Sequence, residues 1–418
     1  MDLAVWTPDG VLAERADAAV REEIRRLSSI LNTRNAESEI RRLGNYSSPA
    51  PGSDLERVFS AYAHWERQTA GLLSIRPSGP DAPRNVDALG KAYIIDRAVQ
   101  AARAAAPDID GLLLNIGGDI VIWGRFCEIA VADPQSPYDN AEPLTRIVLT
   151  NAAIATSGTY ARGAHLLDPS TGQPVKLAAS ATVVAPDAVT ANALATTLCL
   201  AGEEEGMQLV ESTPGAAALR IDAKGSVRRT SSFARLERQP KARPIAALVD
   251  WPAGYQLTVS LTLTEGAAPQ GRGRGGFGGG FGGRGGPKRP YVAIWVEDST
   301  RKIVRVLAFW ADKPRYYTEL STFFVGMGRD QYGLSNVARA TRPPGTYQVV
   351  WDGLDAAGKP VPAGSYTVVV ETNQEHGDYG RNKGVVQCGS EAQADLMLSK
   401  TPNADAISIH YGPKPAQA

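Results

Sequence analysis

Apolar residues recur at helical spacing along the first part of the chain. Val20, Ile24, Leu27 and Leu31 lie three or four residues apart with Arg and Glu between them, so residues 16–43 are predicted to form an amphipathic helix. The same spacing predicts further helices at residues 55–69, 92–105 and 188–200, the last followed by a helical turn rich in Glu.

Short apolar runs between these helices predict strands. The runs cover residues 112–116, 127–132 and 144–149. A chain that contains both helices and strands in separate segments is typical of an α+β domain. We expect this domain to cover residues 1–236.

The hydrophobic period changes to two after a polar stretch at residues 238–243. Alternation at residues 255–264, 291–297, 346–351 and 365–372 predicts strands, and the turn-rich run WDGLDAAGKPVPAG predicts a hairpin between the last two. These features predict a second domain at residues 250–418, an all-β sandwich of immunoglobulin-like character.

One glycine-rich segment, GRGRGGFGGGFGGRGG, interrupts the second domain. Arginine and phenylalanine in such a tract can bind RNA through charge and stacking, whereas a flexible loop inserted at about residues 266–288 is the alternative. The tract has three arginines, and the whole chain balances 44 Lys and Arg against 44 Asp and Glu. We therefore favour the loop and expect no nucleic-acid partner.

Composition excludes several other classes of protein. The chain has 418 residues, long enough for two or three domains, and no apolar run approaches the roughly 20 residues of a transmembrane helix. Three cysteines that lie far apart argue against a disulfide framework or a zinc site. The start, MDLAVWTPDG, shows no signal peptide, which leaves a cytoplasmic location open.

The stretch NVDALGKAYIIDRA at residues 85–98 holds the first candidate for chemistry. Lys91 stands among small and apolar residues that would let a ligand approach the backbone, and Asp96 follows five residues later. By residue type alone, a lysine that points to water from the first turn of a helix is the more common explanation.

A second candidate lies on the predicted helix at residues 188–200. Asn192 and Thr196 are four residues apart, so their side-chain oxygens face the same side of the helix. Mg²⁺ prefers such hard oxygen ligands. A helix packing face with incidental polar groups is the alternative.

Four separated stretches resemble one family in the right order. They are NVDALGKAYIIDRA, LLNIGGDI, IATSGTYARGAHLLDPSTGQPV and SATVVAPDAVTANALATTLCLAG. Together they resemble the ApbE-type FAD:protein FMN transferases over about residues 10–215. The resemblance implies transfer of FMN from FAD to a Ser or Thr hydroxyl of an acceptor flavoprotein, with release of AMP, a requirement for Mg²⁺, and a periplasmic location.

The resemblance also implies roles for individual residues. Lys91 and His165 would be catalytic, His165 either as a general base or as a residue that orients a phosphate. The residues implied to bind the flavin nucleotide are Asn85, Lys91, Gly117, Gly118 and Leu166. The residues implied to hold the metal are Asn192 and Thr196 by their side chains, and Ala88 and Ala195 by their carbonyls.

The chain departs from the family pattern at two carboxylates. Asn85 and Asn192 stand where the family usually has aspartate, and residues 69–75 lack an Ala-Phe-Asp sequence typical of the flavin pocket. An amide oxygen can still bind Mg²⁺, but the site loses negative charge. The alternative function is therefore a catalytically silent FAD-binding module whose β-sandwich docks a partner.

The second domain resembles an uncharacterised domain fused to some ApbE-like proteins. Its WDGLDAAGKPVPAGSY sequence is also similar to a hairpin in flagellar hook-cap immunoglobulin-like domains. Neither resemblance implies a reaction for this domain.

Overall fold

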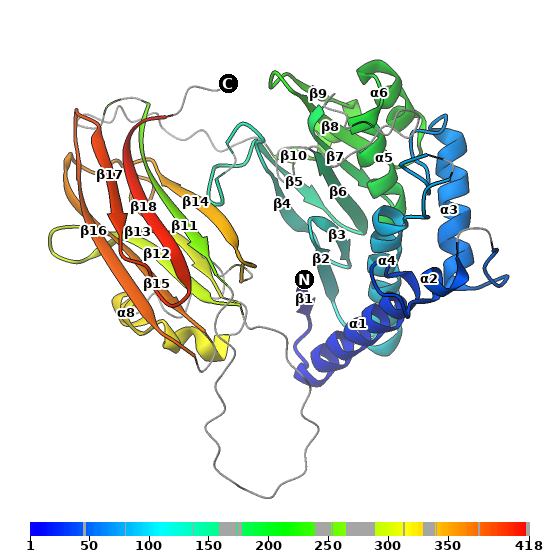
Figure 1. The fold of residues 1–418 in the computed structure, drawn as a ribbon, viewed down its shortest axis with the longest axis horizontal. Helices are drawn as coiled ribbons and strands as arrows, with labels where there is room; N and C mark the ends of the chain where they lie inside the picture. Colours follow the sequence, from blue (N-terminus) through cyan, green and yellow to red (C-terminus); the bar gives the residue numbers. More distant parts are fainter. Residues whose placement is uncertain are drawn as a thin grey trace, which may run out of the picture. The chain divides into compact units, whose positions relative to one another are not determined.

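The computed structural model describes residues 1–44, 47–79, 81–136, 138–158, 173, 178–238, 252, 254–264, 289–311, 314–328, 339, 341–374 and 377–414. The chain divides into two compact units (Figure 1). Unit 1 comprises Met1–Pro137 and Pro143–Lys241, and unit 2 comprises Tyr138–Glu142 and Ala242–Ala418. An α+β domain followed by an all-β domain confirms the predicted fold class.

Unit 1 is built on a seven-stranded antiparallel sheet. Its strands, in spatial order, are β1 (Asp2–Trp6), β2 (Gly111–Ile116), β3 (Asp119–Trp123), β6 (Ala152–Gly158), β7 (Ala178–Ala185), β8 (Ala217–Asp222) and β9 (Val227–Arg229). A smaller sheet contains β10 (Glu237–Arg238), β5 (Thr145–Leu149) and β4 (Cys127–Val131). The helices are α1 (Gly10–Leu31), α2 (Glu39–Leu43), α3 (Asp54–Gln68), α4 (Asp87–Ala105), α5 (Ala188–Leu200), α6 (Glu203–Ser212) and α7 (Ser231–Leu236).

The large sheet of unit 1 is buried on both faces. Alternate residues of its strands, such as Ala153 and Ala155 of β6, share a core with the helices. Ile154, between them, belongs to a second core with the small sheet and Phe233 of α7. Figure 1 shows α1, α3, α4 and α5 on one side of the sheet and β4, β5 and β10 on the other. Unit 1 is therefore a three-layer domain.

The prediction of one helix at residues 16–43 is wrong in its extent. The helix begins at Gly10, where Asp9 accepts a hydrogen bond from the Val11 N–H at 2.8 Å, and it ends at Leu31. Asn32 and Asn35 then accept the N–H groups of Arg34 and Glu37 at 2.9 and 3.1 Å. Such local side-chain bonds compete with helical ones, so a turn separates α1 from α2.

The helix predicted at residues 92–105 begins five residues earlier, at Asp87. The Asn85 side chain accepts the Asp87 N–H at 2.8 Å and so satisfies one free donor of the first turn. Lys91 therefore lies inside α4. The helix predicted at residues 188–200 is confirmed without a shift as α5.

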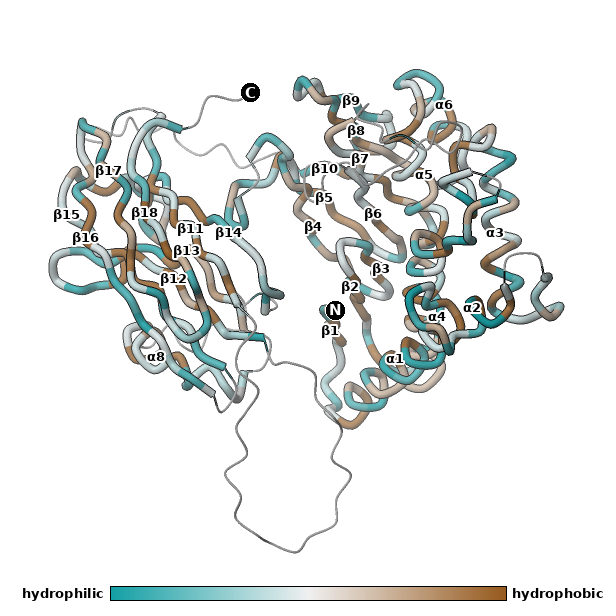
Figure 2. Tube along the Cα trace, in the orientation of Figure 1, coloured by the Kyte–Doolittle hydropathy of each residue, from teal (hydrophilic) through white to brown (hydrophobic). Residues whose placement is uncertain are grey.

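Unit 2 is a sandwich of two four-stranded antiparallel sheets. One sheet contains β14 (Gly345–Trp351), β11 (Tyr255–Leu263), β18 (Ala404–Pro413) and β17 (Gln393–Leu398). The other contains β13 (Ile303–Trp310), β12 (Tyr291–Glu297), β15 (Gly364–Asn373) and β16 (Gly380–Cys388). Apolar residues of both sheets form one core between them, and Figure 2 shows hydrophobic residues along these strands. A second core lies under η1 (Pro314–Glu319) and α8 (Ser321–Gly326). The immunoglobulin-like character of this sandwich stays a prediction.

The predicted hairpin in unit 2 is wrong, because its two strands lie in different sheets. β14 pairs with β11, whereas β15 pairs with β12 and β16. Tight hairpins use loops of about two to five residues, and the longer turn-rich connection here crosses from one sheet to the other.

The segment Tyr138–Glu142 lies along the edge strand β14 within unit 2. The Asp139 N–H donates to the Gln348 carbonyl at 2.9 Å. The Asn140 amide donates to the Val350 carbonyl at 2.6 Å and accepts the Val350 N–H at 2.7 Å. The segment thus pairs backbone groups that an edge strand leaves free.

Candidate functional site

Most of the candidate residues line a cavity of about 1120 Å³ in unit 1. Its walls come from α1, the loop after α3, the first half of α4, the β2–β3 turn, the end of β6, and α5. This volume lies just above the usual range for small-ligand pockets, about 300–1,000 Å³, and suits a ligand as large as a dinucleotide.

Lys91 reaches this cavity from the second turn of α4. Its ammonium nitrogen lies 2.8 Å from Oδ2 of Asp119, and the lysine side chain remains 29% exposed. The start of α4 is fixed from outside by Thr33, whose hydroxyl donates to Asp87 at 2.6 Å. Lys91 is therefore a positioned cation at the cavity wall and does not simply point into water.

Gly117 and Gly118 form the turn of the β2–β3 hairpin and line the cavity. Their φ angles are +61° and +94°, in the left-handed region that glycine adopts without strain. The Gly118 N–H donates to the side chain of Asn115 at 3.0 Å. The turn brings backbone close to the cavity and places the next residue, Asp119, at its wall.

Asp119 is a site residue that the sequence analysis missed. An aspartate beside two glycines has the character of a turn residue, and turn residues are usually exposed. Here it is the first residue of β3, and only 2% of it is exposed. No signal in the sequence distinguishes this buried carboxylate from an exposed one.

The two polar residues of α5 face the same cavity. Asn192 donates through Nδ2 to Oδ2 of Asp119 at 2.9 Å, and the Thr196 hydroxyl lies 3.3 Å from that of Ser157 on β6. Asn192 is 6% exposed, and its Oδ1 is buried without a hydrogen-bond partner. A buried acceptor without a partner is costly, so this oxygen is available to a ligand.

The other predicted residues are distributed unevenly around the site. Asn85 and Ala88 line the cavity, whereas Ala195 is fully buried in α5. His165 and Leu166 lie outside the described residues.

Asp96, from the same stretch as Lys91, contacts α5 instead of the cavity. Its carboxylate accepts the Ala188 N–H at 2.9 Å and the Val189 N–H at 3.3 Å, at the start of α5. Burial raises the pKa of this carboxyl to about 7, and the negative charge of Asp187 acts in the same direction. Asp96 thus fixes the helix that carries Asn192 and Thr196.

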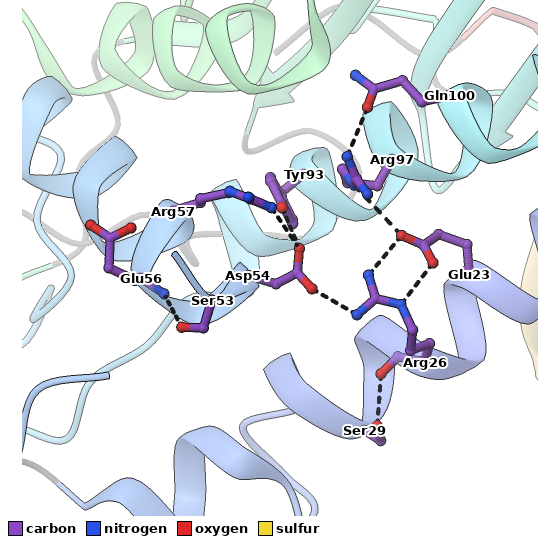
Figure 3. A network of polar contacts seen from close by, with 10 residues as sticks. All are labelled: Glu23, Arg26, Ser29, Ser53, Asp54, Glu56, Arg57, Tyr93, Arg97 and Gln100. Carbon is purple, nitrogen blue, oxygen red and sulfur yellow. Dashed lines mark hydrogen bonds and ion pairs between the residues drawn. The ribbon is translucent and has the colours of Figure 1, made fainter. Parts of the chain in front are cut away.

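A polar network holds α1 and α3 against α4 (Figure 3). Asp54 of α3 lies 2.7 Å from the guanidinium of Arg26 on α1, and it accepts the Tyr93 hydroxyl of α4 at 2.5 Å. Glu23 of α1 binds the same Arg26 at 2.8 Å. Because Tyr93 lies two residues after Lys91, this network fixes the part of α4 that presents the lysine.

The oxygen donors at the cavity fit a hard cation such as magnesium better than zinc or another metal that prefers Cys and His ligands. No group of three or more His, Cys, Asp or Glu side chains within the described residues could hold a metal ion. The amide of Asn192, the hydroxyl of Thr196 and the carboxylate of Asp119 are hard oxygen donors, and Mg²⁺ takes few ligands from protein and the rest from phosphate and water.

Two parts of the chain match known protein families. Residues 75–220 match the model of the ApbE family, and residues 284–402 match the family described as predicted periplasmic protein (DUF2271). The two matches follow one another along the chain, and each covers about a third of it or less. Within the described residues, no helix combines the length and the apolar character that crossing a bilayer requires.

Curated FAD:protein FMN transferases match part of this chain. The FAD:protein FMN transferase of Rhodobacter capsulatus is 29% identical over 177 residues, which cover 39% of this chain and 33% of that protein. The protein of the same name from Vibrio cholerae serotype O1 is 30% identical over 151 residues, covering 32% and 43%. The crystal structure of Pseudomonas stutzeri flavinyl transferase ApbE, apo form, is 19% identical and covers 56% of this chain and 93% of that one, with a TM-score of 0.47. The chain spans a third to a half of the length of the curated relatives it matches.

Proposed function

We propose that the chain transfers FMN from FAD to a Ser or Thr hydroxyl of an acceptor protein. The observation that carries this proposal is the cavity of about 1120 Å³ where the Lys91 ammonium, the Gly117-Gly118 turn and the polar face of α5 converge. The name of the curated relatives, FAD:protein FMN transferase, supports the same reaction.

The reaction exchanges one phosphorus–oxygen bond for another. The acceptor hydroxyl oxygen attacks the phosphorus atom of the FMN half, the bond from that phosphorus to the bridging oxygen breaks, and AMP leaves with that oxygen. The hydroxyl proton passes to a base. His165 is our candidate for the base, by its place in the HLLDPSTG motif.

Lys91 would neutralise charge on the diphosphate, because an ammonium fixed at a cavity wall stabilises negative oxygens without further reorganisation. Gly117 and Gly118 would let the backbone approach the nucleotide. Asn85 would contact the nucleotide through its Nδ2 group, since its Oδ1 already accepts the Asp87 N–H.

A magnesium ion, when bound, would neutralise further charge on the diphosphate. Asn192 and Thr196 would hold it with their side-chain oxygens, and Ala88 and Ala195 with their carbonyls. The buried, unpartnered Oδ1 of Asn192 supports this assignment.

The acceptor is proposed to be another protein. The chain contains no Ser or Thr followed by Gly-Ala-Thr or Gly-Ala-Ser, the acceptor motif that the family resemblance implies. The description of the DUF2271 family as a predicted periplasmic protein supports a periplasmic location for both domains.

The experiment is incubation of the purified chain with FAD, Mg²⁺ and a flavoprotein that carries such a motif. We expect AMP in the supernatant and flavin that stays on the acceptor after denaturation. Lys91→Met should weaken FAD binding about tenfold, close to 1.4 kcal/mol, and leave riboflavin binding less affected. Lys224→Met, which changes an exposed lysine away from the cavity, is the matched control.

The same experiment separates the transferase from the silent binding module. FAD binding without AMP release would favour the silent binding module. Asn85 and Asn192, which stand where the resembling family usually has aspartate, are the feature that supports this alternative. Equal affinity for FAD and riboflavin would overturn the nucleotide assignment altogether, because the inferred contacts are to the phosphates.

A further inference from the structure

The carboxylate of Asp119 is the charged centre of the cavity wall. Its Oδ2 contacts two donors at once, the ammonium of Lys91 at 2.8 Å and the Nδ2 of Asn192 at 2.9 Å. Asp119 itself is 2% exposed, so its charge is compensated by these two side chains and hardly by water.

Asn192 is held in an orientation that satisfies half of its amide. Nδ2 faces Asp119, while Oδ1 is buried without a partner. A rotation of the amide would bring Oδ1 toward the carboxylate of Asp119. Two such oxygens repel each other, so this orientation is favourable only with a cation between them.

A cation between Asp119 and Asn192 would find further oxygen donors nearby. Thr196 lies one helical turn from Asn192, and its hydroxyl is 3.3 Å from that of Ser157. These are the hard, oxygen-only ligands that Mg²⁺ and Mn²⁺ accept.

We propose that Asp119 supplies the negative charge of the divalent-cation site, and that Lys91 occupies the place of the cation until it binds. The cation would contact the carboxylate of Asp119 and the Oδ1 of Asn192. The Lys91 ammonium would then leave Asp119 and contact the diphosphate. The charge missing at position 192 is thus provided from β3. This proposal rests on the proposed function, since the cation is the one that accompanies the flavin nucleotide.

The Asp119–Lys91 pair is neutral before binding, and the two positive charges that the cation adds are offset by the two negative charges of the diphosphate. Asp119 is paired with the ammonium before binding and with the divalent ion afterwards, so it is never left buried without a partner. The released ammonium then finds its compensating charge on the phosphates. A carboxylate that is paired with the ammonium offsets its charge toward phosphate, so the cation and the nucleotide should bind cooperatively.

Binding of Mn²⁺ without flavin tests the exchange directly. The signal of free Mn²⁺ in electron paramagnetic resonance, with Mg²⁺ as competitor, gives the affinity of the full chain and needs no turnover. Asp119→Asn should weaken Mn²⁺ binding at least tenfold, and the double variant Asp119→Asn with Asn192→Asp should regain most of the affinity. Asp108→Asn, at an exposed position away from the cavity, is the matched control.

Lys91→Met gives a second and independent outcome. It removes the competitor for Asp119, so Mn²⁺ should bind this variant several-fold more tightly than wild type, and Mn²⁺ should restore any loss in its melting temperature. Unchanged or weaker binding by Lys91→Met would overturn the exchange, even if Asp119→Asn fails to fold. Unchanged Mn²⁺ affinity in a folded Asp119→Asn variant would overturn the role of Asp119.

Failure of the proposed function gives a different result. If wild type binds Mn²⁺ as described but does not bind FAD, the nucleotide assignment is wrong and the cation site stands. If wild type binds FAD with Mn²⁺ and the variants do not differ from it, the cation site is wrong and the nucleotide assignment stands.

Discussion

Replacing Asp96 by Asn should make the stability of the protein depend on pH in a different way. Asp96 of α4 accepts the N–H groups of Ala188 and Val189 at the start of α5, at 2.9 and 3.3 Å. Asn keeps the shape and one acceptor oxygen but is never charged. The variant therefore isolates the cost of the negative charge from the benefit of the hydrogen bonds.

The sign of the effect follows from the pKa. Burial first, and then the charge of Asp187, raise the pKa of Asp96 from 3.8 to about 7, against the opposite effect of the two backbone N–H groups. The folded state then holds its proton more tightly than the unfolded state. The contribution of this group to stability is complete below about pH 4 and falls as the pH rises toward about 7.

The magnitude follows from the same shift. A change of about three pKa units corresponds to about 4 kcal/mol of unfolding free energy, of which about 3 kcal/mol is lost between about pH 5 and about pH 8. Asp96→Asn does not lose this amount. For a unit of this size, the melting temperature of the variant relative to wild type should rise by about 6–12 °C between about pH 5 and about pH 8.

Thermal unfolding of wild type, Asp96→Asn and Asp96→Ala at both pH values is the assay. Asp96→Ala removes the acceptors as well and should be less stable than Asp96→Asn by about 1–3 kcal/mol at either pH. A difference between wild type and Asp96→Asn that does not change with pH would refute the reasoning. A change in the opposite direction would mean that the helix N–H groups outweigh burial and lower the pKa.

Three further predictions concern other parts of the chain. Asn140→Ala should lower the unfolding free energy of unit 2 by about 1–3 kcal/mol, because it removes both hydrogen bonds to Val350; Asn140→Asp, which keeps the acceptor, should lose less in the same denaturant titration. Thr196→Val should weaken Mg²⁺-dependent FAD binding by about 1 kcal/mol, roughly fivefold by isothermal titration, and an unchanged affinity would remove its hydroxyl from the site. Deletion of residues 266–288 should leave the melting temperature and flavin binding intact, because glycine-rich chain contributes little packing; a large fall in either would show that the tract is structural.

Local patterns predicted those elements that their own residues determine. Helix α5 and strand β12 have the predicted limits, since the first is rich in Ala and Leu and the second in β-branched and aromatic residues. The start of α4 was not predicted, because it depends on a hydrogen bond from the Asp87 N–H to the side chain of Asn85, which precedes the helix. The pairing partners of β14 and β15 were predicted wrongly, because strand pairing is a tertiary property that a turn-rich connection does not determine.

The site divides in the same way. The spacing of Asn192 and Thr196 placed both on one helical face, and the structure has both at the cavity wall. Asp119 could not be selected, because its burial arises only when β3 is covered by α4 and α5. A sequence shows that an aspartate follows two glycines, but it does not show what lies above that aspartate in the fold.

The position of one lysine in a small and apolar segment has a structural explanation in α4. Lys91 and Asp96 are five residues apart, so they point about 140° away from each other around the helix axis. One side presents the ammonium to Asp119 at the cavity, and the other accepts the first N–H groups of α5. Because α4 is a single helix, it fixes the lysine relative to the helix that carries Asn192 and Thr196. The two charges are separated by five residues because one acts on the ligand site and the other on the element that completes it.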